Sequence, residues 1–133
     1  MNSPAPDPSS HTGFKRLSNA TLYSINGFKS CFKTEEAFRL EVYLALILIP
    51  FGLWIGEGRI EKALLVITVL LVLIVELLNT AVERAIDRIS PEKHLLSKES
   101  KDMGSTAVFL SLFLAGITWA LIALPRLFQM IFG

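Results

Sequence analysis

The sequence has only one cysteine, Cys31, among its 133 residues. A lone thiol forms no disulfide within the chain and offers too few ligands for a cysteine-based metal centre. We therefore interpret Cys31 as a small apolar residue of a helix. The sequence also lacks a charge of one sign, since 13 Lys and Arg residues against 12 Asp and Glu residues leave a net charge of +1. Such a balance gives no overall attraction to nucleic acid, so no nucleic-acid partner is expected.

Two common phosphate-binding loops are also missing. The sequence contains neither GxxxxGKS/T nor GxGxxG, and the Gly56-Glu57-Gly58 run is too short to cradle phosphates. No cleavable signal peptide is recognised, because residues 1–10 hold three prolines and no apolar stretch. We expect a disordered tail over residues 1–12 and a single domain over residues 13–133.

Apolar residues are abundant, at 52% of the sequence, and most of them follow residue 42. Three long apolar stretches stand out, at residues 42–55, 63–82 and 103–124. A helix that crosses a bilayer needs about 20 residues, so the first stretch must be extended backward to about residue 37, while the other two are long enough. Pro125 is expected to end the third. The sequence therefore predicts an all-α membrane protein with transmembrane spans at about 37–56, 62–88 and 102–124.

The stretch before the first span, at about residues 14–34, carries apolar residues at helical spacing. These are Phe14, Leu17, Leu22, Ile25, Phe28 and Phe32. Lysine and arginine residues fall between them, which is typical of an amphipathic helix lying on a membrane surface. An ordinary soluble helix is the alternative, but no soluble core is available for it to cover. The sequence thus favours an N-terminal surface helix.

The positions of lysine and arginine predict how the chain crosses the membrane. Five precede the first span, two lie in the first connection, five lie in the second connection and its flanking helix ends, and one follows the third span. Cytoplasmic segments carry the excess of these residues. We therefore expect the N terminus and the second connection in the cytoplasm and the C terminus on the opposite side.

A stripe of polar residues in the second span is the most informative feature. Glu76, Asn79, Glu83 and Asp87 follow one another at steps of three, four and four residues. On a helix they fall within a stripe roughly 80° wide. Hydrogen bonding between helices would explain such a stripe, and Asp87 could reach water at the helix end. Glu76, however, lies inside the apolar run, and a carboxylate at that depth indicates a functional site.

The predicted topology brings further polar residues to the same membrane depth. The first span begins near Glu35 and Glu41, and the third begins near Lys101. Carboxylates and a lysine at the cytoplasmic surface are suited to holding Mg²⁺ and phosphate oxygens. They are equally suited to a network of salt bridges, and the residues alone leave both interpretations open.

Residues 76–104, with the sequence ELLNTAVERAIDRISPEKHLLSKESKDMG, resemble the signature of the prokaryotic diacylglycerol kinases. The resemblance rests on ELLNTAVE followed by KDMGS, and extends to GFKRL at residues 13–17 and EEAFRLE at residues 35–41. It implies a homotrimer whose subunits each have a surface helix and three spans. It also implies transfer of the γ-phosphate of ATP to diacylglycerol, with Mg²⁺, at the cytoplasmic face of a bacterial inner membrane.

The resemblance further implies roles for individual residues. Glu76 takes the position of the catalytic base, and Glu35 and Glu83 take those of metal-binding carboxylates that also contact the nucleotide. The other positions implied for the nucleotide are Arg16, Tyr23, Asn79, Glu92, Lys93, His94, Lys101 and Asp102. The positions implied for the lipid substrate and its surroundings are Arg39, Glu41, Trp54, Glu76 and Ser105.

The sequence also departs from the family pattern near the expected lipid position. Leu40 stands where a glutamine is expected, and Thr21-Leu22 replaces a smaller Ala-Gly pair. Undecaprenol kinases of the same family are therefore an alternative, but their members are shorter, and the DMGS run and the long surface helix favour diacylglycerol. A third interpretation is a non-enzymatic membrane scaffold in which the acidic stripe only holds subunits together.

Overall fold

The computed structural model describes residues 13–89 and 94–133, and in these ranges the chain forms four α-helices. They are α1 (Gly13–Thr34), α2 (Glu36–Ile55), α3 (Gly58–Ile89) and α4 (Leu95–Phe132). By length and composition, α2, α3 and α4 are each suited to crossing a membrane. The predicted all-α membrane fold is therefore confirmed. The tail expected over residues 1–12 lies outside the described residues.

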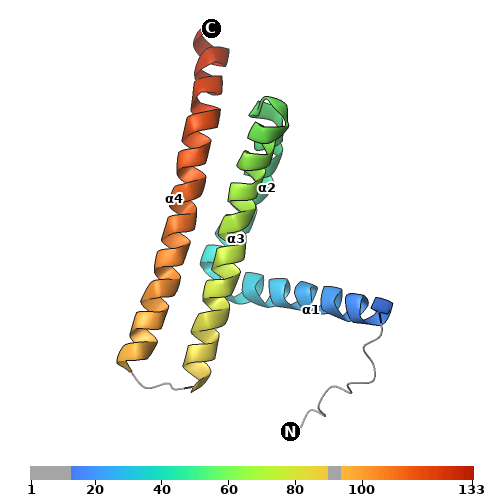
Figure 1. Ribbon diagram of the computed structural model, residues 1–133, viewed down its shortest axis with the longest axis vertical. Coiled ribbons are helices and arrows are strands. Elements are labelled where there is room, and N and C mark those ends of the chain that lie inside the picture. Colours follow the sequence, from blue (N-terminus) through green and yellow to red (C-terminus); the bar gives the residue numbers. More distant parts are fainter. Residues whose placement is uncertain (1–12, 90–93) are drawn as a thin grey trace.

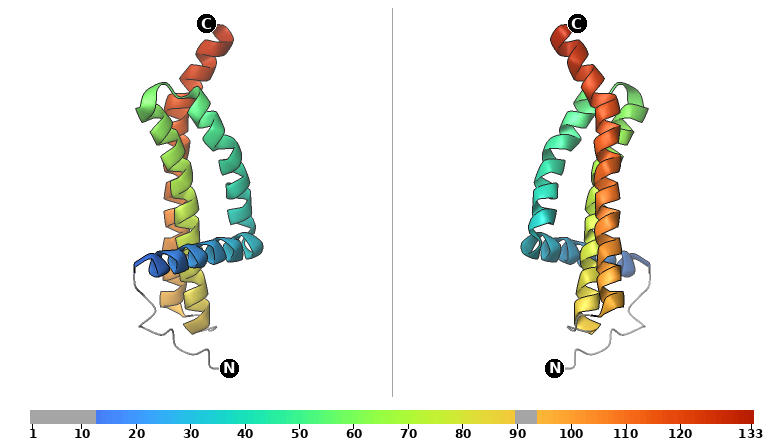
Figure 2. Two further views of the ribbon diagram at one scale, coloured as in Figure 1. Left: turned by 90° about the vertical axis from the view of Figure 1, so that its right-hand side faces the viewer. Right: turned by 90° about the vertical axis from the view of Figure 1, so that its left-hand side faces the viewer.

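The central helix of the bundle is α3. It packs against both α2 and α4, whereas α2 and α4 touch each other over a much shorter stretch. Figure 1 shows α3 and α4 running side by side in opposite directions. In both views of Figure 2, α1 crosses the bundle near the end that lies opposite the C terminus. Its direction relative to the other helices is the one that a surface helix takes beside transmembrane spans.

A corner at Glu35 joins α1 to α2. Its backbone is extended, with φ −106° and ψ 111°, so one helix ends and the next begins there. The Arg39 guanidinium donates hydrogen bonds to the carbonyl oxygens of Phe32 at 3.1 Å and Lys33 at 2.9 Å. These are carbonyls that the end of α1 leaves without helical partners. The corner is therefore stabilised by a side chain from α2.

At the other end of α2, a glycine allows the three long helices to approach closely. A β-carbon on Gly52 would lie 3.1 Å from Cβ of Leu65 in α3 and 3.2 Å from Cη2 of Trp119 in α4. The Trp119 Nε1–H donates to the carbonyl oxygen of Leu65 at 3.2 Å. Small residues promote this kind of packing between membrane helices. The contact fixes the end of the bundle that lies away from α1.

The third span does not end at Pro125, and here the expectation from the sequence was wrong. Helix α4 continues through Pro125 to Phe132, and Figure 2 shows its last turns inclined away from the rest of the helix. A proline removes one hydrogen bond and bends a helix, and membrane helices tolerate it where neighbouring helices support the residues around it. Support comes from Arg126, which forms ion pairs with Glu57 at 2.7 Å and Glu61 at 3.3 Å.

Candidate active site

The polar stripe of α3 begins with a carboxylate that the fold holds away from the surface. Glu76 is only 8% exposed, and Thr80, one turn further along, is 5% exposed. A carboxylate in apolar surroundings is costly in free energy, so its presence there makes it a candidate for a functional role. In such a position it is able to accept a proton from a substrate group that reaches it.

Asn79, the second member of the stripe, faces α4. Its Oδ1 atom is buried and has no hydrogen-bond partner among the described residues. A β-carbon on Gly104 would overlap that atom and would lie 3.2 Å from the Cγ atom of Asn79. The asparagine of ELLNTAVE therefore packs directly against the glycine of KDMGS. Asn79 therefore has an unmet hydrogen-bond acceptor buried beside Gly104.

Three further carboxylates lie close enough to Glu76 for their charges to interact with it. Glu41 comes from α2, and its Oε2 atom is buried without a hydrogen-bond partner in the described part of the chain. Glu35 comes from the α1–α2 corner, and Glu83 follows on α3. We call Glu35, Glu41, Glu76 and Glu83 the acidic cluster. Like charges that lie near one another repel, so the carboxylates of this cluster disfavour one another's ionisation.

The donor atoms of the acidic cluster suit a hard metal ion such as Mg²⁺. Carboxylate and amide oxygens are its usual ligands, and Mg²⁺ is commonly held by one or two carboxylates together with substrate phosphates. Over residues 13–89 and 94–133, no three His, Cys, Asp or Glu side chains lie close enough to hold a metal by themselves. The described side chains therefore do not form a complete metal cage.

An arginine from α3 reaches Glu35. The Arg84 guanidinium forms an ion pair with Oε1 of Glu35 at 3.4 Å and donates hydrogen bonds to the hydroxyl groups of Ser30, at 3.0 Å, and Thr34. The Thr34 hydroxyl lies 3.2 Å from Oε1 of Glu35 and 3.0 Å from the carbonyl oxygen of Ser30, and its one hydrogen is shared between these two acceptors. The side chain of Glu35 is therefore held from two directions, although its backbone lies outside any helix.

The lysine and aspartate of KDMGS point to different partners. Lys101 on α4 forms an ion pair with Asp87 at the end of the α3 stripe, at 2.6 Å, while Asp102 forms one with Lys98, also at 2.6 Å. Asp87 therefore reaches a lysine of the neighbouring helix. His94 caps α4, with its Nδ1 accepting a hydrogen bond from the Leu96 amide at 3.2 Å.

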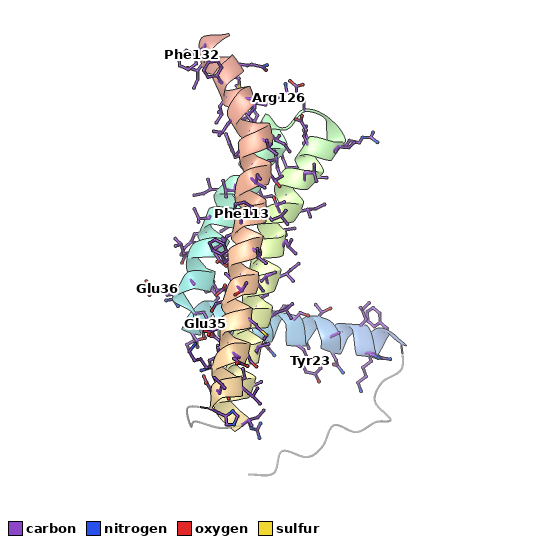
Figure 3. The ribbon with its side chains drawn as sticks, turned by 60° about the vertical axis from the view of Figure 1, so that its left-hand side comes forward. Tyr23, Glu35, Glu36, Phe113, Arg126 and Phe132 are labelled. Carbon is purple, nitrogen blue, oxygen red and sulfur yellow. The ribbon has the colours of Figure 1, made fainter. Side chains whose placement is uncertain are left out.

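Several residues expected at the site do not meet the acidic cluster within one chain. Arg16 and Tyr23 line a shallow cavity along α1, together with Asn19 and Ala20. Figure 3 shows Tyr23 on the part of α1 that extends away from the bundle, whereas Glu35 lies where α1 joins it. Nucleotide contacts from Arg16 and Tyr23 would therefore need another arrangement than a single subunit provides.

Three residues expected near the lipid lie in quite different places. Trp54 stands at the far end of α2, where it lines a cavity with Glu57, Arg126 and Gln129. Ser105 is exposed on α4, beside Gly104. Arg39 is occupied by the carbonyls at the end of α1. Glu92 and Lys93 lie outside the described residues.

Sequence reasoning overlooked Thr80, Arg84 and the packing role of Gly104. A signal for the first two was present, because Glu76, Thr80 and Arg84 recur every four residues and so lie near one another on the helix. From the sequence, Arg84 counts only among the lysine and arginine residues that predict how the chain crosses the membrane. The role of Gly104 could not be read from its neighbours, since its partner belongs to another helix.

Comparison with known proteins gives a consistent picture. A family model for prokaryotic diacylglycerol kinase matches residues 22–123, which include all of α2, α3 and the acidic cluster. A diacylglycerol kinase of Haemophilus influenzae is 52% identical over 108 residues, covering 81% of this chain and 92% of the relative. One from Pseudomonas aeruginosa is 50% identical over 113 residues, covering 85% and 92%. One from Escherichia coli K12 is 41% identical over 111 residues, covering 84% and 91%.

Proposed function

The chain belongs to the prokaryotic diacylglycerol kinase family and is a diacylglycerol kinase, and we propose that phosphoryl transfer takes place at its acidic cluster. The reaction moves the γ-phosphate of ATP to the primary hydroxyl of diacylglycerol and gives phosphatidic acid and ADP. The observation that carries this proposal is the buried carboxylate of Glu76, which lies close enough to Glu35, Glu41 and Glu83 for their charges to act on it. No other polar group of the described residues combines such burial with such neighbours.

Glu76 acts as the general base in this proposal. It accepts the proton of the lipid hydroxyl while the hydroxyl oxygen bonds to the γ-phosphorus and the bond to the ADP oxygen breaks. Its position in the apolar part of α3 suits a substrate that arrives from the bilayer. Glu41 of α2 lies close enough for its charge to act on Glu76, and its buried Oε2 has no hydrogen-bond partner in the described part of the chain. Arg39 supports this side of the site indirectly, by holding the α1–α2 corner.

We assign Mg²⁺ to Glu35 and Glu83, and the nucleotide phosphates to Asn79 and Lys101. Mg²⁺ bound with ATP neutralises the negative charge of the phosphates during transfer. Asn79 offers a side-chain amide, and Lys101 offers an ammonium group, which forms an ion pair with Asp87. Asp102 follows Lys101 in the chain and His94 caps α4, and we assign both to the nucleotide side as well.

We further propose that the enzyme is a homotrimer. The distance of Tyr23 from the acidic cluster along α1 supports this assembly, because a neighbouring subunit could bring its own α1 to the cluster (Figure 3). A single chain also leaves much of the apolar surface of α4 uncovered, with only 11% of its most apolar segment buried. Contact between subunits and with lipid would cover it.

The proposed location is the bacterial inner membrane, with the acidic cluster facing the cytoplasm. The end of the bundle near α1 carries most of the lysine and arginine residues, whereas the opposite end carries Arg59, Lys62 and Arg126. This distribution supports a cytoplasmic N terminus. ATP would then reach the cluster from the cytoplasm and the lipid from the bilayer.

A transfer assay with purified protein tests the proposal. Radiolabelled ATP is supplied in mixed micelles that contain diacylglycerol, undecaprenol or neither lipid, with Mg²⁺ or with EDTA. We expect labelled phosphatidic acid only with diacylglycerol and Mg²⁺. Preferential labelling of undecaprenol would show that the enzyme is an undecaprenol kinase of the same family. No transfer to either lipid by folded protein would support the scaffold interpretation, and transfer in EDTA would remove Mg²⁺ from the mechanism.

A further inference from the structure

Helix α1 is attached to the bundle mainly through its last turns. Figure 1 shows its N-terminal end projecting away from the other helices, while its C-terminal end meets α2 and α3. Phe28 packs edge-on against the buried ring of Phe38 in α2, with centroids 5.3 Å apart. The direction of the whole helix, including Arg16 and Tyr23, therefore depends on a few contacts near the corner at Glu35.

Arg84 of α3 makes polar contacts with the end of α1 and with Glu35. We call this set of contacts the joint between α1 and α3. Its Nη1 donates to Oγ of Ser30 at 3.0 Å, and its Nη2 donates to Oγ1 of Thr34 and lies 3.4 Å from Oε1 of Glu35. Ser30 and Thr34 are one turn apart on the same side of α1. The planar guanidinium offers several donors in a fixed geometry, so one side chain holds two helix positions and a carboxylate together.

We propose that Arg84 is a positioning residue, which joins the end of α1 to α3 and sets the direction of the Glu35 carboxylate before metal and nucleotide bind. This inference rests on the proposed role of Glu35 as a metal ligand. Arg84 directly follows Glu83, so the turn of α3 that carries one proposed metal ligand also holds the other. Glu35 is a single extended residue between two helices, and the side-chain groups that contact its Oε1 atom are those of Arg84 and Thr34.

Direct phosphate binding by Arg84 is the competing role. Both of its terminal nitrogens, however, already donate to Ser30, Thr34 or Glu35. These contacts take three of the five guanidinium N–H groups, so a phosphate that used the same three would have to displace Ser30, Thr34 or Glu35. The positioning role keeps all of the contacts and is the one that the geometry favours.

Cys31 provides a probe of the joint that needs neither metal nor nucleotide. It is the only cysteine of the sequence, it is 3% exposed, and with Ser30, Thr80 and Arg84 it lines a cavity between α1 and α3. Loosening α1 from α3 would expose its thiol. Burial raises the pKa of this thiol, and the charge of Arg84 opposes that effect. Removal of Arg84 would therefore slow alkylation through ionisation alone, so a faster reaction can only report greater access.

The first experiment measures the rate of Cys31 alkylation by iodoacetamide in nucleotide-free micelles. Arg84→Ala is compared with Arg84→Lys and with the control Arg88→Ala, which alters an exposed arginine one turn further along α3. For Arg88, no hydrogen bond or ion pair to another described residue is present. We expect about fivefold faster alkylation in Arg84→Ala, as for loss of one or two hydrogen bonds, a smaller change in Arg84→Lys, and none in the control. Equal alkylation rates in the parent protein and the three variants would show that Arg84 does not hold α1 against α3.

The second experiment tests the positioning of Glu35 and separates it from the proposed function. The Mg²⁺ concentration for half-maximal activity is measured for Arg84→Ala, Arg84→Lys and Glu35→Gln. We expect Arg84→Ala to raise it about fivefold, with kcat at saturating Mg²⁺ within about twofold of the parent and partial recovery in Arg84→Lys. A fall in kcat with unchanged Mg²⁺ dependence would point to phosphate binding and overturn the positioning role. Unchanged Mg²⁺ dependence in Glu35→Gln would instead remove Glu35 from the metal site, whatever the alkylation rates show.

Discussion

Gly104 of α4 packs against the side chain of Asn79 of α3 with no room for a β-carbon. Such an atom would overlap Oδ1 of Asn79 and lie 3.2 Å from its Cγ. The two most characteristic segments of the sequence, ELLNTAVE and KDMGS, therefore meet face to face. This contact brings α3 and α4 close together beside the acidic cluster, and it explains why a glycine serves in the middle of a helix, where it is otherwise unfavourable.

Substitution of Gly104 by alanine is expected to disturb both packing and activity. The added methyl group must push Asn79 aside or separate the helices, which costs about 1–3 kcal/mol. We expect a lower unfolding temperature in detergent and a reduced kcat. Gly116→Ala is the matched control, since a β-carbon there would meet nothing within 4 Å. Its stability should be equal or slightly higher, because alanine favours helix. Identical behaviour of the two variants would contradict the close contact.

A second change distinguishes crowding from a general effect at position 104. Asn79→Ala removes the side chain against which the new methyl group would press. In the double variant Gly104→Ala/Asn79→Ala, the unfolding temperature should therefore recover relative to Gly104→Ala alone, although kcat stays low if Asn79 contacts the nucleotide. Strictly additive losses of stability would show that the two residues do not interact.

The substitution Glu76→Gln separates an enzyme from a scaffold. It keeps the shape of the side chain but removes the carboxylate that accepts a proton. We expect kcat to fall by about 100-fold or more, the usual scale for loss of a positioned base, while the KM for ATP changes little. The free energy of unfolding should be unchanged or higher, since a buried charge is lost. A variant with near-normal kcat would exclude Glu76 as the base.

Arg126 holds the end of α4 and is expected to affect stability without affecting catalysis. Arg126→Gln removes the ion pairs with Glu57 and Glu61, which are partly exposed and are worth up to about 1 kcal/mol. The unfolding temperature in detergent should fall by a few degrees. Figure 3 shows Arg126 toward the end of the bundle away from Glu35, so kcat should stay within about twofold of the parent value. A large loss of kcat in a folded Arg126→Gln protein would show that Arg126 contributes to catalysis as well as to stability.

The thiol of Cys31 should react slowly in the native protein and more readily at high pH. Burial raises its pKa, so less thiolate is present at any pH near neutrality than for a free cysteine. The rate of alkylation should therefore rise with pH, with a midpoint above that of the same protein unfolded in dodecyl sulfate. The two pH–rate profiles give the answer directly. Coinciding midpoints would show that the end of α1 does not bury the thiol.

Local patterns in the sequence were sufficient for most of the helical architecture. Three long apolar stretches predicted three spans, and apolar residues at helical spacing predicted α1, because a bilayer-spanning helix and a surface helix each need a pattern that neighbouring residues supply. The same holds for the stripe from Glu76 to Asp87, which lies on one side of α3 by periodicity alone. The family resemblance, carried by contiguous motifs, was equally available before the structure.

Contacts between helices could be settled only by the tertiary structure. Pro125 indicated a helix end, yet α4 continues because Arg126 reaches Glu57 and Glu61, which lie more than 60 residues earlier. Arg84 contacts Glu35, which lies 49 positions earlier in the sequence, and Gly104 of α4 contacts Asn79 of α3. Periodicity gives the side of a helix on which a residue lies, but its partner depends on how whole helices are turned and shifted against each other. That choice is made by packing over the full length of the bundle.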